Sequence, residues 1–228
     1  MSETIKRHNP FMQPYGTVHD TVPFDKITLA DYEEAMIEGM RREKEEIDLI
    51  INCHSEPTFD NTIIKDDPFK GRKHYYDLLD RVDSVFFNIL SAETNDELEE
   101  LAQKMSPLLT KHENDISLNP KLFERIKYVY EHHRQLTPEE QKLLDDTYEG
   151  MVRGGALLDE KEKEKLRALT EEASLLSLQF RQNLLKETKA FILHITDEKE
   201  LDGLPETQVT AAREAAEDRD MEGWVITL

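Results

Sequence analysis

The sequence predicts a mainly α-helical fold, a multi-helix array with one long scaffold helix and a small β pair near the C-terminus. Over most of the chain, apolar residues recur at steps of three or four, the spacing that places them on one side of an α-helix. Residues 159–189 extend this pattern furthest and contain neither proline nor glycine. At 1.5 Å per residue, a helix of that length would span roughly 45 Å.

Residues 1–27 are expected to form an extended N-terminal arm. Pro10, Pro14, Gly16 and Pro23 interrupt regular structure there. Aromatic residues stand between these breakers, so we expect the arm to lie on a surface of the protein rather than to float free.

Residues 28–189 are expected to form a helical domain, whose helices are placed by their start signals. Such a signal is an N-cap Ser, Thr, Asp or Asn, often followed by an acidic residue three positions later or by a proline at the first helical position. A further helix without such a signal is expected from His74 to Leu90. The predicted N-caps are Thr28, Thr58, Thr94, Asn119, Thr137 and Asp159.

Proline and glycine indicate where these helices end or bend. Pro107 should kink or break the helix that follows Thr94, because an internal proline removes a backbone hydrogen bond. Gly154 and Gly155 should end the helix that precedes the long one.

The long helix carries a stripe of apolar side chains, which we expect to be simply core. Nothing on this helix suggests chemistry, so it is interpreted as a scaffold. The stripe consists of Leu166, Leu169, Ala173, Leu176, Phe180 and Leu184, and it is widened by Leu175, Leu178 and Leu185.

Residues 190–228 are expected to form a short mixed α/β segment. Residues 190–195 and 224–228 have strand character and could pair with each other, while Asp197 and Pro205 should start short helical pieces between them. The chain ends inside the second predicted strand, which suggests a truncated domain.

Composition excludes several classes of partner. The net charge of -20 over 228 residues would repel nucleic acids and anionic membranes. The single cysteine, Cys53, excludes an intrachain disulfide. No segment approaches the apolar length of a membrane span, and residues 1–20 contain no apolar run typical of a signal peptide.

A search for catalytic motifs finds only an incomplete one. A zinc-peptidase helix needs two histidines four residues apart, with a glutamate after the first. His112 and Glu113 begin this pattern, but Ile116 occupies the position of the second histidine. His132 and His133 are adjacent and point in different directions on a helix. The sequence therefore predicts no catalytic, cofactor-binding or metal-binding residue in this chain.

Longer segments carry a resemblance to a known family. They are NPFMQPYGTVHDTVPFDKI (Asn9–Ile27), PTFDNTI (Pro57–Ile63), LLDRVDSVFFNILSAETNDELEELAQKMSPLL (Leu78–Leu109), ISLNPKLFERIKYVYE (Ile116–Glu131), LSLQFRQNLLKET (Leu176–Thr188) and the terminal GWVITL. In this order they resemble bacterial peptidyl-dipeptidases, which are dipeptidyl carboxypeptidases of the thimet oligopeptidase family of zinc metallopeptidases. The loop from Lys65 to His74 departs from the family pattern.

The resemblance implies a cytoplasmic zinc enzyme that releases dipeptides from the C-terminus of short peptides. The H-E-x-x-H helix and the glutamate zinc ligand of the family would lie beyond Leu228. This chain would then be the N-terminal non-catalytic part, truncated before the catalytic region. It would form part of the substrate-channel wall and pack against the C-terminal catalytic half of the same polypeptide. Alone, it would bind no zinc, cleave no peptide and tend to self-associate at high concentration.

A self-standing helical module that binds peptides or proteins without catalysis is the alternative. The reading frame beyond Leu228 separates the two hypotheses. Continuation into an H-E-x-x-H helix would support the enzyme, and a stop codon would support the module.

Overall fold

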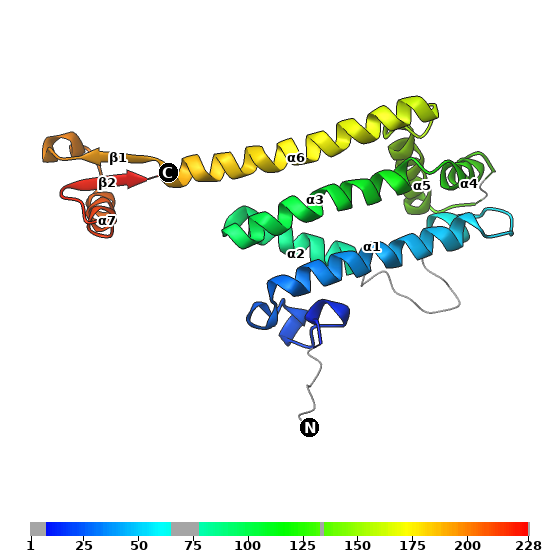
Figure 1. The fold of residues 1–228 in the computed structure, drawn as a ribbon, viewed down its shortest axis with the longest axis horizontal. Coiled ribbons are helices and arrows are strands. Elements are labelled where there is room, and N and C mark those ends of the chain that lie inside the picture. The colour runs from blue at the N-terminus through cyan, green and yellow to red at the C-terminus, as the bar shows by residue number, and fades with distance from the viewer. Residues whose placement is uncertain (1–7, 65–77, 133–134, 228) are drawn as a thin grey trace, which may run out of the picture. The chain divides into compact units, whose positions relative to one another are not determined.

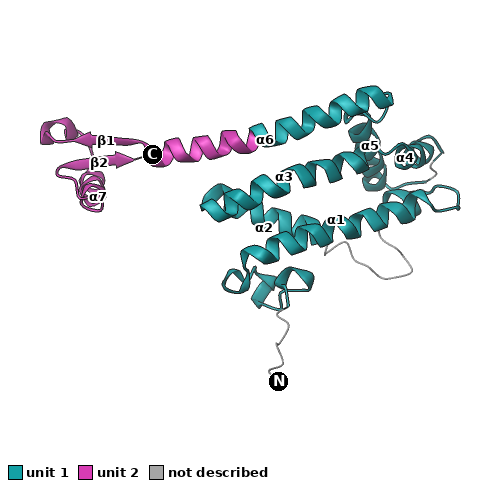
Figure 2. Ribbon diagram, in the orientation of Figure 1, with its two compact units in different colours: residues 1–176 teal, residues 177–228 magenta. Residues whose placement is uncertain are grey.

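The computed structural model describes residues 8–64, 78–132 and 135–227. The chain divides into two compact units (Figure 2), an N-terminal unit of Met1–Leu176 and a C-terminal unit of Ser177–Leu228. The fold is predominantly helical, with a two-stranded sheet near the C-terminus. The predicted fold class is therefore confirmed.

The N-terminal unit is a series of helices that follow one another along the chain (Figure 1). Helices α1, α2 and α3 lie side by side, and α4 packs against α5. The predicted start of α2 at residue 74 lies outside the described residues. The elements are three 3₁₀ turns in the arm, η1 (Pro10–Met12), η2 (Val18–Asp20) and η3 (Phe24–Lys26), then α1 (Leu29–Ile51), the π-helical turn η4 (Phe59–Ile63), α2 (Leu78–Ala92), α3 (Asp96–Ser117), α4 (Pro120–His132), α5 (Pro138–Arg153) and α6 (Glu160–Ala190).

Several predicted helix starts are confirmed by capping hydrogen bonds. At the start of α1, Asp31 accepts hydrogen bonds from the backbone N–H and the hydroxyl of Thr28, at 2.7 and 2.6 Å. Before α5, the side chains of Thr137 and Glu140 each accept from the other residue's backbone N–H. Asp159 caps α6 in the same way. These bonds satisfy N–H groups that have no partner inside the helix.

Helix α3 differs from its prediction in two respects. Its N-cap is Asn95 and not Thr94, because the Asn95 side chain accepts the hydrogen bond from the Leu98 N–H at 2.9 Å. The helix also continues through Pro107, so of the two outcomes predicted there, a kink or a break, the break does not occur. An internal proline costs about 3 kcal/mol, and burial of the apolar side of α3 offsets this cost.

Helices α1 and α2 approach closely at a glycine. A Cβ atom added to Gly39 would lie 2.9 Å from backbone atoms of Leu79, so the crossing leaves no room for a side chain. Aromatic rings fill the space between the same helices and the arm. The ring centroids of Tyr32 and Phe86 are 5.3 Å apart, and Phe11 of the arm packs on Tyr32, also at 5.3 Å.

Polar side chains attach the first half of α6 to the end of α3. Lys163 is only 3% exposed, and its ammonium group donates to the carbonyl oxygen of Leu118 at 3.2 Å. The Asn114 side chain donates to the Thr170 hydroxyl at 2.8 Å. The backbone carbonyl oxygen of Asn114 accepts from the Arg167 guanidinium at 3.4 Å. The last carbonyl groups of a helix lack intrahelical partners and carry partial negative charge, so cations stabilise them.

The prediction that the apolar stripe of the long helix is core is wrong for most of that stripe. Leu169, Leu176, Phe180 and Leu184 are 61, 62, 69 and 58% exposed. For Leu169 and Leu176, which belong to the N-terminal unit, the polar attachment to α3 explains this orientation. Leu176 follows Arg167 by nine residues, about two and a half turns, and therefore lies on the opposite side of α6. We call these four apolar residues the outer stripe.

The C-terminal unit combines the end of α6 with a small sheet and a helix (Figure 1). Strand β1 (Ile192–Ile195) pairs antiparallel with β2 (Trp224–Thr227), which confirms the predicted pairing. The turn η6 (Glu198–Leu201) and helix α7 (Glu206–Glu217) connect the two strands. The buried core of this unit consists of Ile195, Leu201, Ala212 and Trp224.

The close crossing of α1 and α2 predicts that Gly39 tolerates no side chain. We expect Gly39→Ala to lower the free energy of unfolding by about 1–3 kcal/mol, because the added methyl group overlaps the backbone at Leu79. Chemical denaturation followed by circular dichroism measures this change.

Gly150→Ala is the matched control, since Gly150 is also helical and a Cβ atom there meets nothing within 4 Å. This variant should be stabilised by about 0.5–1 kcal/mol, the ordinary gain from replacing a helical glycine. Equal stability changes in the two variants would show that the crossing at Gly39 is not tight.

Candidate functional site

The histidines singled out in the sequence form local contacts within the protein. His112 Nε2 lies 2.9 Å from Glu43 Oε2, and this pair connects α3 to α1. The His132 ring stacks on Tyr128, and its Nδ1 lies 2.9 Å from the carbonyl oxygen of that residue. His194 Nε2 lies 2.7 Å from a backbone carbonyl oxygen of the C-terminal unit. His133 lies outside the described residues.

Metal and membrane signals are absent from the part of the chain that the structure describes. Within residues 8–64, 78–132 and 135–227, no three His, Cys, Asp or Glu side chains form a group that could hold a metal ion. Among the helices described here, none has both the length and the apolar character required to cross a membrane.

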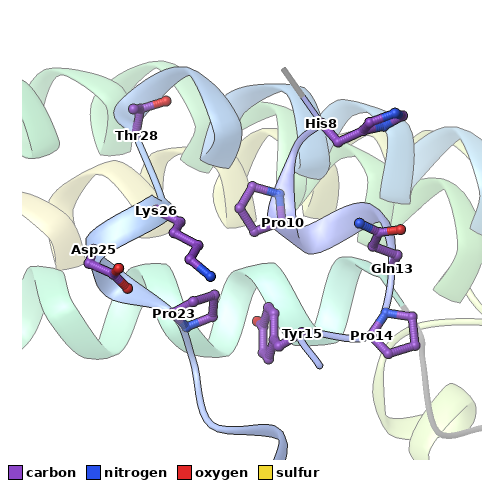
Figure 3. Close-up of a pocket in the computed structure, with 9 residues that line it drawn as sticks. All are labelled: His8, Pro10, Gln13, Pro14, Tyr15, Pro23, Asp25, Lys26 and Thr28. Carbon is purple, nitrogen blue, oxygen red and sulfur yellow. The ribbon is translucent and has the colours of Figure 1, made fainter. Parts of the chain in front are cut away.

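The arm folds around a cavity of about 510 Å³ (Figure 3). Burial raises the pKa of the Tyr15 phenol, although the nearby charge of Arg81 opposes this effect. The wall contains both acidic and basic side chains, so it selects no single ligand charge. The cavity is lined by His8, Pro10, Gln13, Pro14, Tyr15, Pro23, Asp25, Lys26 and Thr28.

Arg81 of α2 binds the arm that forms this cavity. Its guanidinium Nη2 donates to the carbonyl oxygen of Gln13 at 2.8 Å and to that of Phe11. The same group lies over the Tyr15 ring, 4.6 Å from the centroid, where the face of the ring attracts a cation. One side chain thus fixes several main-chain positions of the arm.

Arg125 of α4 likewise binds an irregular part of the chain, the segment that follows α1. Its guanidinium donates to the carbonyl oxygen of Cys53 at 2.9 Å and to the side-chain oxygen of Asn61 at 3.1 Å. A hydrogen bond from the Ser55 backbone and the charge of Arg125 lower the pKa of the Cys53 thiol. Cys53 is half-buried after the end of α1.

Asp83 of α2 lies in an environment that disfavours its charged form. Burial is the largest cause, and the negative charges of Asp80 and Glu113 add to it, so that the pKa of Asp83 is raised to about 6. These acidic residues come from α2 and α3, and they form no metal-binding group in the described structure.

The outer stripe of α6 is the most extended exposed apolar feature of the long helix. Its side chains recur at helical spacing over Leu169–Leu184 and are all more than half exposed. In the C-terminal unit, Phe191, which follows α6, and Leu193 of β1 are 44 and 49% exposed. Contiguous exposed apolar residues are typical of surfaces that another chain segment or protein covers.

Sequence reasoning found the stripe but not the side of the helix that faces outward. The spacing of the leucines shows only which residues share one side of α6. The side that packs on α3 is instead fixed by Lys163 and Arg167, and charged residues of this kind are expected at the surface from the sequence alone. The arm-binding role of Arg81 and the segment-binding role of Arg125 have no sequence signal, because their partners are backbone carbonyl groups about 70 residues away.

Comparison with known proteins shows that the chain belongs to the thimet oligopeptidase family. Its relatives in this family include dipeptidyl carboxypeptidases. The chain is 36% identical over 223 residues to that of Salmonella typhimurium and 35% identical over 227 residues to that of Escherichia coli. Each alignment covers 96% of this chain and 32% of the relative.

A more distant relative is oligopeptidase A of Escherichia coli, which is 23% identical over 96% of this chain and 31% of its own length. No family-wide sequence model matches the chain. The chain thus spans about a third of the length of the curated relatives it matches.

The binding of the arm by Arg81 can be tested with a conservative substitution. Arg81→Lys keeps the charge but cannot reach several carbonyl groups at once. We expect this variant to lose about 1–2 kcal/mol of stability, as for charge-assisted hydrogen bonds, and amide hydrogen exchange to accelerate in residues 11–17. Arg41→Lys on the exposed side of α1 is the control. Unchanged exchange in the arm of Arg81→Lys would contradict the role given to Arg81.

The raised pKa of Asp83 predicts a pH dependence of stability. The folded state favours the neutral carboxyl group, so this group's contribution to stability is present below about pH 4 and is lost as the pH rises through about 6. Asp83→Asn should remove that loss. After allowance for partial exposure, we expect a gain of about 1 kcal/mol at pH 7–8.

Thermal denaturation of the parent and the variant between pH 4 and pH 8 measures this difference. Asp115→Asn, which replaces an exposed acid on α3, is the control for the loss of one negative charge. If the parent and Asp83→Asn differ in stability by the same amount at pH 4 and at pH 8, the titration of Asp83 is not the cause of that stability difference.

Proposed function

We propose that this chain is the N-terminal, non-catalytic part of a zinc peptidyl-dipeptidase that acts in the cytoplasm. The complete enzyme releases dipeptides from the C-terminus of short peptides. This part contributes the fold scaffold and a section of the substrate-channel wall. Its organisation is an arm at residues 1–27, a helical domain at 28–189 and a mixed segment at 190–228.

One observation carries this proposal. The dipeptidyl carboxypeptidases align with 96% of this chain, but with only 32% of their own length. The sequence of the chain contains no H-E-x-x-H pattern. The chemistry of such an enzyme is therefore assigned to the other two thirds of the polypeptide.

The side chains of the described residues do not fit a zinc site. Catalytic zinc sites use three protein ligands, which are commonly histidines with a carboxylate, and the described part of the chain contains no suitable group of three. In the complete enzyme, zinc would activate the attacking water with the help of a glutamate base.

A scaffold role agrees with the contacts that the chain does form. The described histidines discussed above contact groups of the chain itself. The buried Lys163 and the half-buried Arg125 bind backbone carbonyl groups. Such contacts fix the positions of helices relative to one another within the N-terminal unit. They supply rigidity to a channel wall without contributing a reacting group.

The proposal predicts that zinc binding and peptidase activity belong to the complete polypeptide and not to the 228-residue chain. The polypeptide encoded by the complete reading frame should bind one zinc ion per chain and release dipeptides from an N-blocked peptide. The 228-residue chain should do neither, because it lacks the ligand pattern. Metal analysis after gel filtration and mass spectrometry of the peptide products measure both properties.

A chelator-treated sample of the complete polypeptide is the control, and added zinc should restore its activity. A reading frame that stops at Leu228 would instead favour a self-standing helical binding module. Stoichiometric zinc binding by the 228-residue chain, abolished by replacing one histidine, would contradict the assignment of the metal to the rest of the polypeptide.

A further inference from the structure

We draw no further inference here: the strongest candidate, the cavity that the arm forms at residues 8–28, is lined by side chains of both charges and its Tyr15 hydroxyl is closed off from solvent, so nothing among the described residues shows which ligand would fill it.

Discussion

The contact between Lys163 and the carbonyl oxygen of Leu118 determines how the longest helix is used. A lysine that is almost fully buried needs a partner, and the unsatisfied end of α3 supplies one. Arg167 and Thr170 continue this polar contact along α6. Once this side is fixed against α3, helical geometry leaves Leu169 and Leu176 of the N-terminal unit facing outward. The exposure of these two side chains is therefore a consequence of the polar attachment.

The same kind of interaction recurs at other places in the N-terminal unit. Arg81 binds carbonyl groups of the arm, and Arg125 binds those of the segment after α1. In each case a cation on a regular helix fixes a neighbouring segment that cannot form a complete hydrogen-bond ladder of its own. Buried backbone carbonyl groups require such partners. The helices thus provide both the apolar core and the polar groups that hold irregular segments in place.

These features explain how a chain can belong to a peptidase family while its described residues contribute packing rather than a metal-binding group. A catalytic site requires converging titratable side chains, whereas the polar side chains described here mostly contact the backbone or each other at helix surfaces. Asp83 is a partial exception, because its environment disfavours the charged form. Its neighbours are acidic, however, and they supply neither a nucleophile nor a cation.

The sequence by itself determined the helices, most of their starts and the β pair. Capping pairs such as Thr137 with Glu140 act over three residues, and the antiparallel strands repeat a local apolar pattern, so both can be read without knowing the fold. The sequence also determined the family, through segments spread along the chain. Only the tertiary structure decided that Gly39 is a close crossing point and that Leu169 and Leu176 face away from α3. Each of these features depends on contacts between residues that are far apart in the chain. The periodicity of one helix shows which residues share a side, but it does not show whether that side packs against another element or faces solvent.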